Sequence, residues 1–327
     1  MESNKLNKEV NRNLFKKEVK VFAPATVANM VCGYDVLGFA LEEPGDLVIM
    51  KSSDTPGVLL KSITGDDGKL PMDPTQNTVS ACCMMLLEDL GLTGEIGVEI
   101  ELHKQMPIGS GLGSSAASTV GGVFALNELL GRPLSREELL PYCLHGEEIA
   151  CGHPHPDNVT PALMGGITLI RSDDPLDVVN LPVPDKLFAA VVFPKVDVPT
   201  RDAREMIKSR VLLKDAVKQW GNIAGLVAGL FRSDYELIGR SMEDVLIEPV
   251  RSILIPDFAQ MKEIALSLGA LSFGISGSGP TVLAMCKSAE DATAIKDALS
   301  AHLESVMVES YAYSSKVNAE GPKCLSN

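Results

Sequence analysis

The chain is poor in positive charge. Its 327 residues include 29 lysine and arginine residues against 43 aspartate and glutamate residues, which gives a formal net charge of −14 at pH 7. A surface this acidic repels nucleic-acid phosphates, so we expect no nucleic-acid partner. It also repels ATP at long range. Any nucleotide site must therefore gain local positive charge from backbone N–H groups, a cation or a few arginines.

The chain also lacks a Cys-x-x-Cys pair and a long apolar run. Its seven cysteines, an odd number, are typical of reduced thiols in a cytoplasmic protein rather than of a disulfide framework. No stretch approaches the roughly 18 apolar residues of a membrane span, so we expect no membrane partner. Residues 1–17 are polar and have no signal-peptide core, and we expect them to form a flexible extension.

Strand and helix patterns alternate in clusters rather than in strict βαβα order, which favours an α+β fold of two domains. The proline-containing stretch at 178–184 suggests domains at 18–180 and 181–327. We expect strands at 19–23 (ending at Pro24), 47–51, 57–61, 97–102, 165–170 and 187–192. We expect helices at 77–90, 114–130, 201–208, 213–231 and 235–242, a capping box at Ser135 and Glu138, and a last β/α set at 258–313.

The segment PIGSGLGSSAAS, residues 107–118, has the composition of a phosphate-binding loop. Three alternate glycines, Gly109, Gly111 and Gly113, leave room for the backbone to approach a phosphate. A helix that begins at Ser114 directs its free N–H groups and its positive dipole end at the same place. Ser114 and Ser115 add hydroxyls for phosphate oxygens or Mg²⁺.

Other glycine-rich loops fit this segment less well. A Walker loop, GxxxxGK[ST], requires a lysine that is missing here, and a Rossmann loop requires GxGxxG rather than GxGxG. The remaining alternative is a glycine turn that only caps a buried helix. The preceding β-rich segment and proline favour phosphate binding over that alternative.

Three motifs resemble those of the GHMP kinases: PxxxGLGSSAAS at 107–118, APATVAN at 23–29 and SGSGP at 276–280. The resemblance extends from residue 19 to about residue 313. It implies the GHMP kinase fold, with an N-terminal domain like ribosomal protein S5 domain 2 and a C-terminal ferredoxin-like domain. ATP and a small-molecule substrate would bind between the two domains.

Four segments, at 23–41, 155–166, 199–204 and 248–251, resemble the homoserine kinase branch of this family. The resemblance implies that Mg²⁺-dependent, in-line transfer moves the γ-phosphate of ATP to the side-chain hydroxyl of L-homoserine, a step in threonine biosynthesis. It also implies a homodimer. Asn158 stands where several relatives, mevalonate kinase among them, have aspartate, and an asparagine cannot act as a general base. We therefore expect direct transfer without a protein base.

The resemblance also implies a set of site residues. Asn29 and Asp35 would hold the amino group, Arg204 and Arg251 the carboxylate, and His155, Asn158 and Thr200 would lie at the reacting end. Glu147 and Ser114 (or Ser115) would bind Mg²⁺. ATP would contact Pro107, Ile108, Gly109, Ser110, Gly111, Leu112, Gly113, Ser114, Ser115, Ala116, Ala117 and Asn77.

Most of these assignments have a structural alternative. Asn29 and Asp35 could be turn residues, and Arg204, Arg251 and Glu147 could be surface charges. Residues 276–280 could form a tight turn. The Cys-x-His-x-His pattern at 151–155 lacks a fourth ligand at zinc spacing. A GHMP kinase for a mevalonate-type or sugar substrate and a non-catalytic ATP-binding sensor are the alternative functions.

Overall fold

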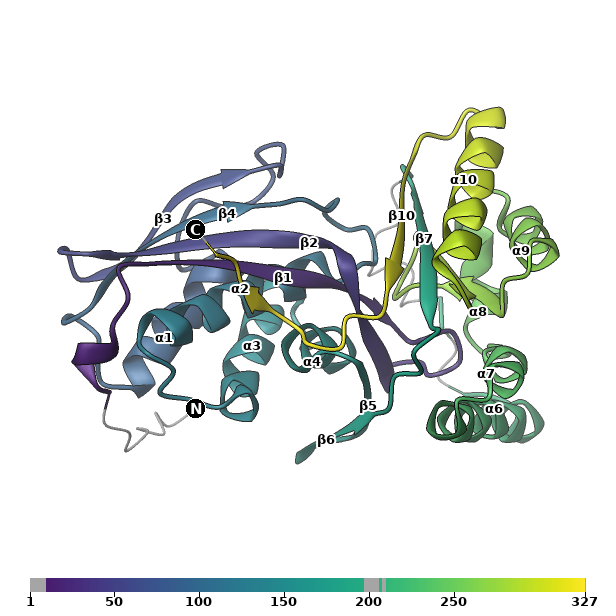
Figure 1. Cartoon of the computed structure of the whole chain (residues 1–327), viewed down its shortest axis with the longest axis horizontal. Helices are drawn as coiled ribbons and strands as arrows, with labels where there is room; N and C mark the ends of the chain where they lie inside the picture. Colours follow the sequence, from purple (N-terminus) through teal and green to yellow (C-terminus); the bar gives the residue numbers. More distant parts are fainter. Residues whose placement is uncertain (1–9, 197–205, 208–209, 327) are drawn as a thin grey trace.

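The computed structural model describes residues 10–196, 206–207 and 210–326, except for the side chains of residues 150 and 151. These residues form two units, each built on its own β-sheet (Figure 1). The elements follow in the order η1 (Arg12–Leu14), β1 (Glu18–Ala28), β2 (Leu37–Ser53), β3 (Gly57–Thr64), α1 (Thr78–Asp89), β4 (Gly97–His103), α2 (Ser114–Leu129), α3 (Arg136–Cys151), α4 (Pro156–Met164), β5 (Ile167–Asp173), β6 (Leu176–Leu181), β7 (Phe188–Pro194), α6 (Leu213–Arg232), α7 (Tyr235–Ser241), α8 (Glu248–Arg251), η2 (Ser252–Leu254), α9 (Phe258–Ser267), β8 (Ser272–Ile275), β9 (Val282–Cys286), α10 (Ala289–Ser305), β10 (Ser310–Lys316) and β11 (Lys323–Cys324).

The N-terminal unit has a seven-stranded sheet in the order β11-β1-β2-β4-β3, with β5 and β6 branching from β2. Its strands β3 and β4 are parallel and are connected through α1. Helices α1 to α4 cover one face of the sheet (Figure 1). The core lies between them, where strand residues such as Ile100 pack against residues of α2 such as Val120.

The C-terminal unit has a four-stranded antiparallel sheet in the order β10-β7-β9-β8. Helices α9 and α10 pack on one face, around Met261 and Leu299. Apolar residues of α6 and α7, including Leu226 and Ile238, join the residues of the β1–β2 connection in a second core cluster. This cluster bridges the two units and brings their loops together.

The expected elements are present with some differences. Strand β1 continues through Pro24 to Ala28, because a register shift between Pro24 and Thr26 accommodates the missing N–H. The stretch expected to separate the domains, 178–184, overlaps strand β6, which pairs with β5. Residues 10–17, expected to be flexible, are described here, and Phe15 packs against the N-terminal core. The helix expected at 201–208 lies almost wholly outside the described residues.

The end of the chain returns to the N-terminal sheet. Val317 pairs with Leu41, and β11 pairs with β1 through Cys324 and Val21. The C-terminal strand therefore adds to the sheet of the other unit, which the sequence does not indicate. No described helix is long and apolar enough to cross a bilayer.

Candidate active site

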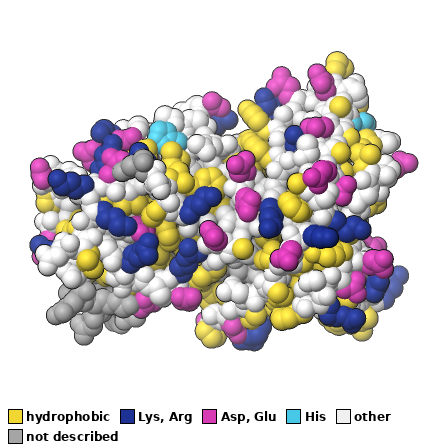
Figure 2. All heavy atoms as spheres, viewed as in Figure 1, with side chains coloured by type: hydrophobic (Ala, Val, Ile, Leu, Met, Phe, Trp, Pro, Cys, Tyr) yellow, Lys and Arg dark blue, Asp and Glu magenta, His cyan; other side chains and the backbone are white. Residues whose placement is uncertain are grey.

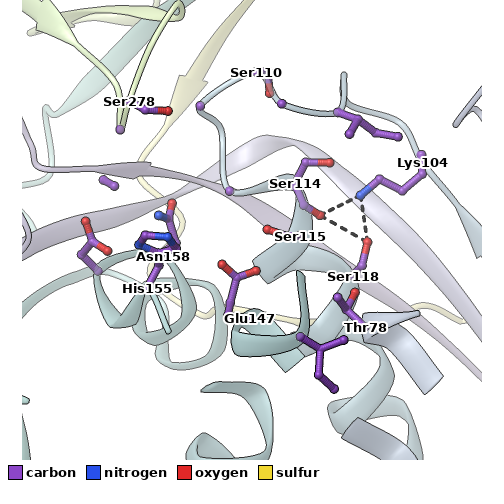
Figure 3. A pocket seen from close by; sticks show the side chains of 18 of the residues that line it. Thr78, Lys104, Ser110, Ser114, Ser115, Ser118, Glu147, His155, Asn158 and Ser278 are labelled. Atoms are coloured by element: carbon purple, nitrogen blue, oxygen red, sulfur yellow. Dashed lines mark hydrogen bonds between the residues drawn. The ribbon is translucent and has the colours of Figure 1, made fainter. Parts of the chain in front are cut away.

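A cavity of about 400 Å³ lies where loops of both units meet. Its wall combines the start of α2, the β1–β2 loop, the start of α4, the end of α8 and the β8–β9 loop. Figure 3 shows Glu147, Ser114, Ser115 and Lys104 on one side, with His155 and Asn158 of α4 on the other. The predicted site residues that line it are Asn29, Asp35, Asn77, Ile108, Gly109, Ser110, Gly111, Gly113, Ser114, Ser115, Glu147, His155, Asn158 and Arg251.

The glycine loop adopts a backbone that other residues would strain. Gly109, Gly111 and Gly113 have φ angles of 69°, 80° and 63°. A Cβ atom at Gly111 would lie 2.7 Å from the carbonyl oxygen of Ser276, and one at Gly113 would lie 2.0 Å from Thr26 Oγ1. Gly113 is also the N-cap of α2 and supplies no side-chain acceptor. The first N–H groups of this 16-residue helix therefore point toward the cavity end without a capping side chain, as an anion site requires.

A second glycine loop, SGSGP at 276–280, packs against the first. The hydroxyl of Ser276 donates a hydrogen bond to the carbonyl oxygen of Gly111 at 2.7 Å, and that of Thr281 donates to the carbonyl oxygen of Ser110. These bonds join the C-terminal sheet to the 107–118 loop. The segment 276–280 therefore does more than reverse the chain direction, because it also supports the 107–118 loop.

Glu147 lies on α3, only 2% exposed, with its carboxylate directed at the start of α2 (Figure 3). Its Oε1 and the nearby Ser114 Oγ are both buried without a hydrogen-bond partner. Burial raises the pKa of Glu147 to about 7, and the Ser115 hydroxyl and the Lys104 cation oppose this rise. Carboxylate and hydroxyl oxygens left unsatisfied beside a phosphate loop fit the donor set of Mg²⁺.

The raised pKa makes stability depend on pH in the absence of a divalent cation. Between pH 4.5 and about 7 the folded protein keeps a proton on Glu147 that the unfolded chain loses, so this stabilising contribution falls as pH rises. We expect Glu147→Gln to gain up to about 3 kcal/mol relative to wild type across this range. Thermal unfolding in EDTA at several pH values measures the difference, and a difference independent of pH would contradict it.

Lys104 is a site residue that the sequence does not single out. It is buried at the end of β4, forms an ion pair with Asp46, and donates to the carbonyl oxygen of Ser114 at 2.7 Å and to Ser118 Oγ at 2.8 Å. The ammonium group thus anchors the first turn of α2 at the cavity wall, and the paired Asp46 carboxylate balances its charge. The one feature of the sequence that could have pointed to Lys104 is its position three residues before the 107–118 loop.

Asn29 shapes the β1–β2 loop. Its Oδ1 accepts a hydrogen bond from the backbone N–H of Asp35 at 2.9 Å, and its Nδ2 donates to the carbonyl oxygen of Gly277 at 2.8 Å. Asn29 and Asp35 both have positive φ angles, of 70° and 57°, in keeping with the preference of these residue types for such turns. The turn alternative is therefore correct for the backbone of both residues, while both also line the cavity.

Arg251 is only 4% exposed, so it is not a surface charge. Its guanidinium group lies 5.3 Å from the ring centroid of Tyr34 and donates to the carbonyl oxygen of Gly277 at 3.1 Å. It is the last residue of the short helix α8. The carboxylate of Asp244 accepts three backbone N–H bonds at the start of that helix, which fixes the direction of the turn that carries Arg251.

At the start of α4, the hydroxyl of Thr26 donates to Asn158 Oδ1 at 2.8 Å. The bond orients the Asn158 amide beside Gly113 of the phosphate loop. His155 is the N-cap of α4, and the neighbouring Asp157 is 4% exposed; both line the cavity. The sequence-based assignment omits both Asp157, which lines the cavity, and Thr26, which holds the Asn158 amide from behind the lining.

Several predicted residues do not present side chains to the cavity. Leu112, Ala116 and Ala117 are buried in the hydrophobic core, and none of these three residues or Pro107 lines the cavity. Thr200 and Arg204 lie outside the described residues.

The cavity wall near the start of α1 combines polar and apolar groups. Asn77 caps α1 by accepting from the N–H of Val79 at 3.1 Å and also donates to the carbonyl oxygen of Pro71 at 2.8 Å. Leu70, Pro71 and Ile149 add apolar surface next to it. Scattered single residues of this kind carry no sequence motif, which is why only Asn77 was predicted.

Two family models match the chain, "GHMP kinases N terminal domain" at residues 77–166 and "GHMP kinases C terminal" at residues 226–305. The homoserine kinase of Chlorobium phaeovibrioides is 47% identical over 293 residues, which cover 86% of this chain and 91% of that protein. The homoserine kinase of Chloroherpeton thalassium is 45% identical over 318 residues, which cover 94% of this chain and 100% of that protein.

Solved structures give the same family. The crystal structure of homoserine kinase from Cytophaga hutchinsonii matches with a TM-score of 0.92 and 54% identity, covering 95% of this chain and 98% of that chain. The L. major mevalonate kinase in complex with R-mevalonate matches with a TM-score of 0.71 and 17% identity, covering 92% and 98% of the two chains. At that low identity the second match shows the shared fold alone.

Proposed function

The chain belongs to the GHMP kinase family, within its homoserine kinase branch, and we propose that its cavity holds ATP at the 107–118 loop and L-homoserine between the β1–β2 loop and α8. The reaction is ATP-dependent phosphorylation of the side-chain hydroxyl of L-homoserine to O-phospho-L-homoserine, in threonine biosynthesis. The observation that carries this function is the identity of 45–47% to homoserine kinases over most of the chain.

ATP is proposed to bind with its phosphates at the start of α2. The uncapped N–H groups of this helix supply local positive charge that the acidic chain otherwise lacks, and Lys104 holds the first turn of the helix in place. The apolar residues Leu70, Pro71 and Ile149 would contact the base end. Mg²⁺ would be held by Glu147 and Ser114, and it would neutralise charge on the phosphates.

L-homoserine is proposed to bind as a zwitterion. The carboxylate of Asp35 suits the substrate ammonium group, and the buried guanidinium group of Arg251 suits the substrate carboxylate through paired hydrogen bonds. Arg204 would share the second role, as the family resemblance implies. The substrate hydroxyl would then face the phosphate loop near Asn158, with His155 and Thr200 at the same end.

Transfer is proposed to be direct and in line, with no protein base. Phosphoryl transfer passes through a loose transition state, so positioning and charge stabilisation contribute most of the rate. The hydroxyl proton can leave to the transferred phosphoryl group as the new bond forms. Thr26 and Asn158 would orient the hydroxyl through the hydrogen bond that they share.

This mechanism predicts a small effect of the acid next to Asn158. We expect Asp157→Asn to lower kcat by less than about tenfold, whereas loss of a general base would cost about 10²–10⁴-fold. Asn158→Ala is the comparison, because it removes the orienting amide without removing an acid. Rapid-quench measurement of the chemical step at saturating substrates distinguishes transfer without a protein base from transfer that uses Asp157 as the base. Loss of turnover in Asp157→Asn with both substrates still bound would identify Asp157 as the base.

The activity is tested by coupled measurement of ATP consumption with L-homoserine. L-serine and L-threonine are controls for the length and substitution of the hydroxyl chain, while mevalonate and galactose test the alternative GHMP substrates. Turnover with L-homoserine well above all four is the expected result. Failure to consume ATP with any hydroxy amino acid would favour a non-catalytic ATP-binding protein. A cytoplasmic location and a homodimer are further proposals from the family resemblance.

A further inference from the structure

Two segments that are distant in sequence carry the charged groups proposed to bind L-homoserine. Asp35 lies in the β1–β2 loop, and Arg251 is the last residue of α8. An α-amino acid has its ammonium group and its carboxylate on one carbon atom, so the two protein groups must keep a fixed separation to contact both at once. The contacts that hold the two segments at this separation therefore influence how well the site recognises an amino acid.

At the proposed active site, one carbonyl group connects the two segments. The carbonyl oxygen of Gly277 accepts a hydrogen bond from Asn29 Nδ2 at 2.8 Å and another from Arg251 Nη1 at 3.1 Å. Asn29 in turn accepts from the backbone N–H of Asp35 at 2.9 Å. Gly277 belongs to the 276–280 loop, so this first connection depends on a third segment of the chain.

Next to this connection, the two segments do not pack completely against each other. A small cavity of about 10 Å³ is lined by Val31 and Tyr34 of the β1–β2 loop and by Ile247 and Arg251 of the α8 segment. A volume of this size holds about one water molecule. Apolar packing between the segments is therefore incomplete at this point, and polar contacts contribute more to holding them in place.

The side-chain amide of Gln219 in α6 makes a second connection between the same two segments. Its Nε2 donates to the carbonyl oxygen of Cys32 at 2.6 Å, and its Oε1 accepts from the backbone N–H of Val245 at 3.0 Å. Cys32 belongs to the loop that carries Asp35, and Val245 lies in the segment that leads to α8. Gln219 lines neither cavity. One amide therefore uses its donor and its acceptor to connect both substrate-binding segments from outside the site.

The Gln219 amide is shielded from water and comes from a well-anchored helix. Charged side chains of both signs are interspersed over the face of the C-terminal unit that Figure 2 shows, and Gln219 lies inside the surface, only 5% exposed. Helix α6 lies beside α7 (Figure 1), and its Leu226 and Leu230 belong to the core cluster that bridges the two units. Water cannot readily replace the two hydrogen bonds of a buried amide, so their loss would leave both peptide groups unsatisfied.

We propose that Gln219 is a positioning residue for substrate selection, because it sets the separation between Asp35 and Arg251. The site then favours a substrate that carries an ammonium group and a carboxylate on one carbon atom. Gln219 itself does not contact the substrate. The inference rests on the proposed function, since it assumes that Asp35 and Arg251 bind the two charged groups of L-homoserine. The alternative is that the amide only satisfies two buried peptide groups and stabilises the fold.

Gln219→Met tests the proposal, because methionine removes both hydrogen bonds but keeps an unbranched side chain of similar length. L-homoserine has both charged groups, 3-aminopropanol lacks the carboxylate, and 4-hydroxybutanoate lacks the ammonium group. We expect kcat/KM for L-homoserine to fall about tenfold, through KM rather than kcat, as for the loss of coupling between neighbouring groups. The values for the two analogues should change less than about twofold, because each analogue uses only one of the two protein groups. KM for ATP should stay constant.

Asn222→Ala is the matched control. Asn222 lies three residues later in α6, and its Nδ2 donates to the carbonyl oxygen of Glu243 at 2.7 Å. This bond joins the same helix to the segment before α8 but does not involve the β1–β2 loop, so its loss should leave selectivity unchanged. Gln219→Asn is a second variant, whose amide is one methylene too short to contact both partners, and it should behave like Gln219→Met. Dissociation constants from isothermal titration calorimetry give the same comparison for an analogue that is not phosphorylated.

Three results would overturn the positioning role of Gln219. The first is an equal loss with all three compounds, or no loss with any of them, in the folded Gln219 variants. The second is the same change of selectivity in Asn222→Ala, which would attribute the effect to α6 as a whole. The third is loss of the folded state in both Gln219 variants, measured by circular dichroism, which would assign the amide to the stability of the fold. Wild-type protein that does not phosphorylate L-homoserine would instead contradict the proposed function.

Discussion

Replacing Glu147 with glutamine is expected to lower kcat by about 10²–10³-fold, the size of effect seen when one preorganised electrostatic group is lost from an active site. Glu147 is buried beside Ser114, and an oxygen of each side chain has no hydrogen-bond partner. Glutamine keeps the shape of the side chain but removes the negative charge and one of the two oxygens that a divalent cation would use. The Mg²⁺ concentration that gives half-maximal activity should rise in parallel.

Glu148→Gln is the matched control for this experiment. Glu148 is the next residue of α3, with a side chain that is 55% exposed and directed toward His145 rather than into the cavity. We expect activity and Mg²⁺ dependence close to wild type in this variant. Equal activity of the two variants at all Mg²⁺ concentrations would exclude Glu147 as a ligand. The remaining explanation for its burial would then be structural.

Replacing Arg251 with alanine is expected to lower kcat/KM for L-homoserine by about 10²-fold or more, because a buried charge pair with the substrate carboxylate would lose one partner. Arg251→Lys should lose less, since the ammonium group keeps the charge but not the paired hydrogen bonds of a guanidinium group. The discriminating measurement uses 3-aminopropanol, which has the hydroxyl and the ammonium group of L-homoserine but no carboxylate. The loss should be large for L-homoserine and small for this amino alcohol.

The control for Arg251 is Arg240→Ala, which removes an exposed arginine of α7 in the same unit. It should leave both substrates unaffected. A general weakening of the site in Arg251→Ala, through loss of its contacts with Tyr34 and Gly277, would reduce activity with both substrates equally. That outcome would assign Arg251 a structural role in the β1–β2 loop instead of carboxylate binding.

Local features of the fold were predictable because their causes are local. The helix expected at 77–90 is present, with Asn77 as its N-cap, and the capping box of Ser135 and Glu138 is present as expected, since each depends on residues within one helical turn. The start of α2 at Ser114 follows from the glycines before it. Strand β1 was predicted too short because proline usually ends a strand, whereas pairing with β2 resumes after a register shift.

Long-range features were not predictable from spacing. Lys104, Asp46 and Ser118 form one buried cluster, yet they come from the end of β4, the middle of β2 and the second turn of α2. The return of the chain end to β1 is equally invisible, because two paired residues at 323–324 have no strand pattern of their own. In both cases the partners are distant in sequence, and only packing of the whole chain brings them together.

The sequence by itself determined the family that the chain resembles, and it predicted a phosphate-binding loop at 107–118 and the residue types suited to a zwitterionic substrate. These features depend on the chemistry of short segments, where glycines permit the backbone and serines, asparagine and acidic residues supply the ligands. Only the tertiary structure decided which of those residues share one cavity, that Glu147 and Ser114 are buried with unsatisfied oxygens, and that the buried Gln219 amide connects the β1–β2 loop to the segment before α8. Burial is a property of the packed chain, so the same glutamate or leucine has a different energy in each environment.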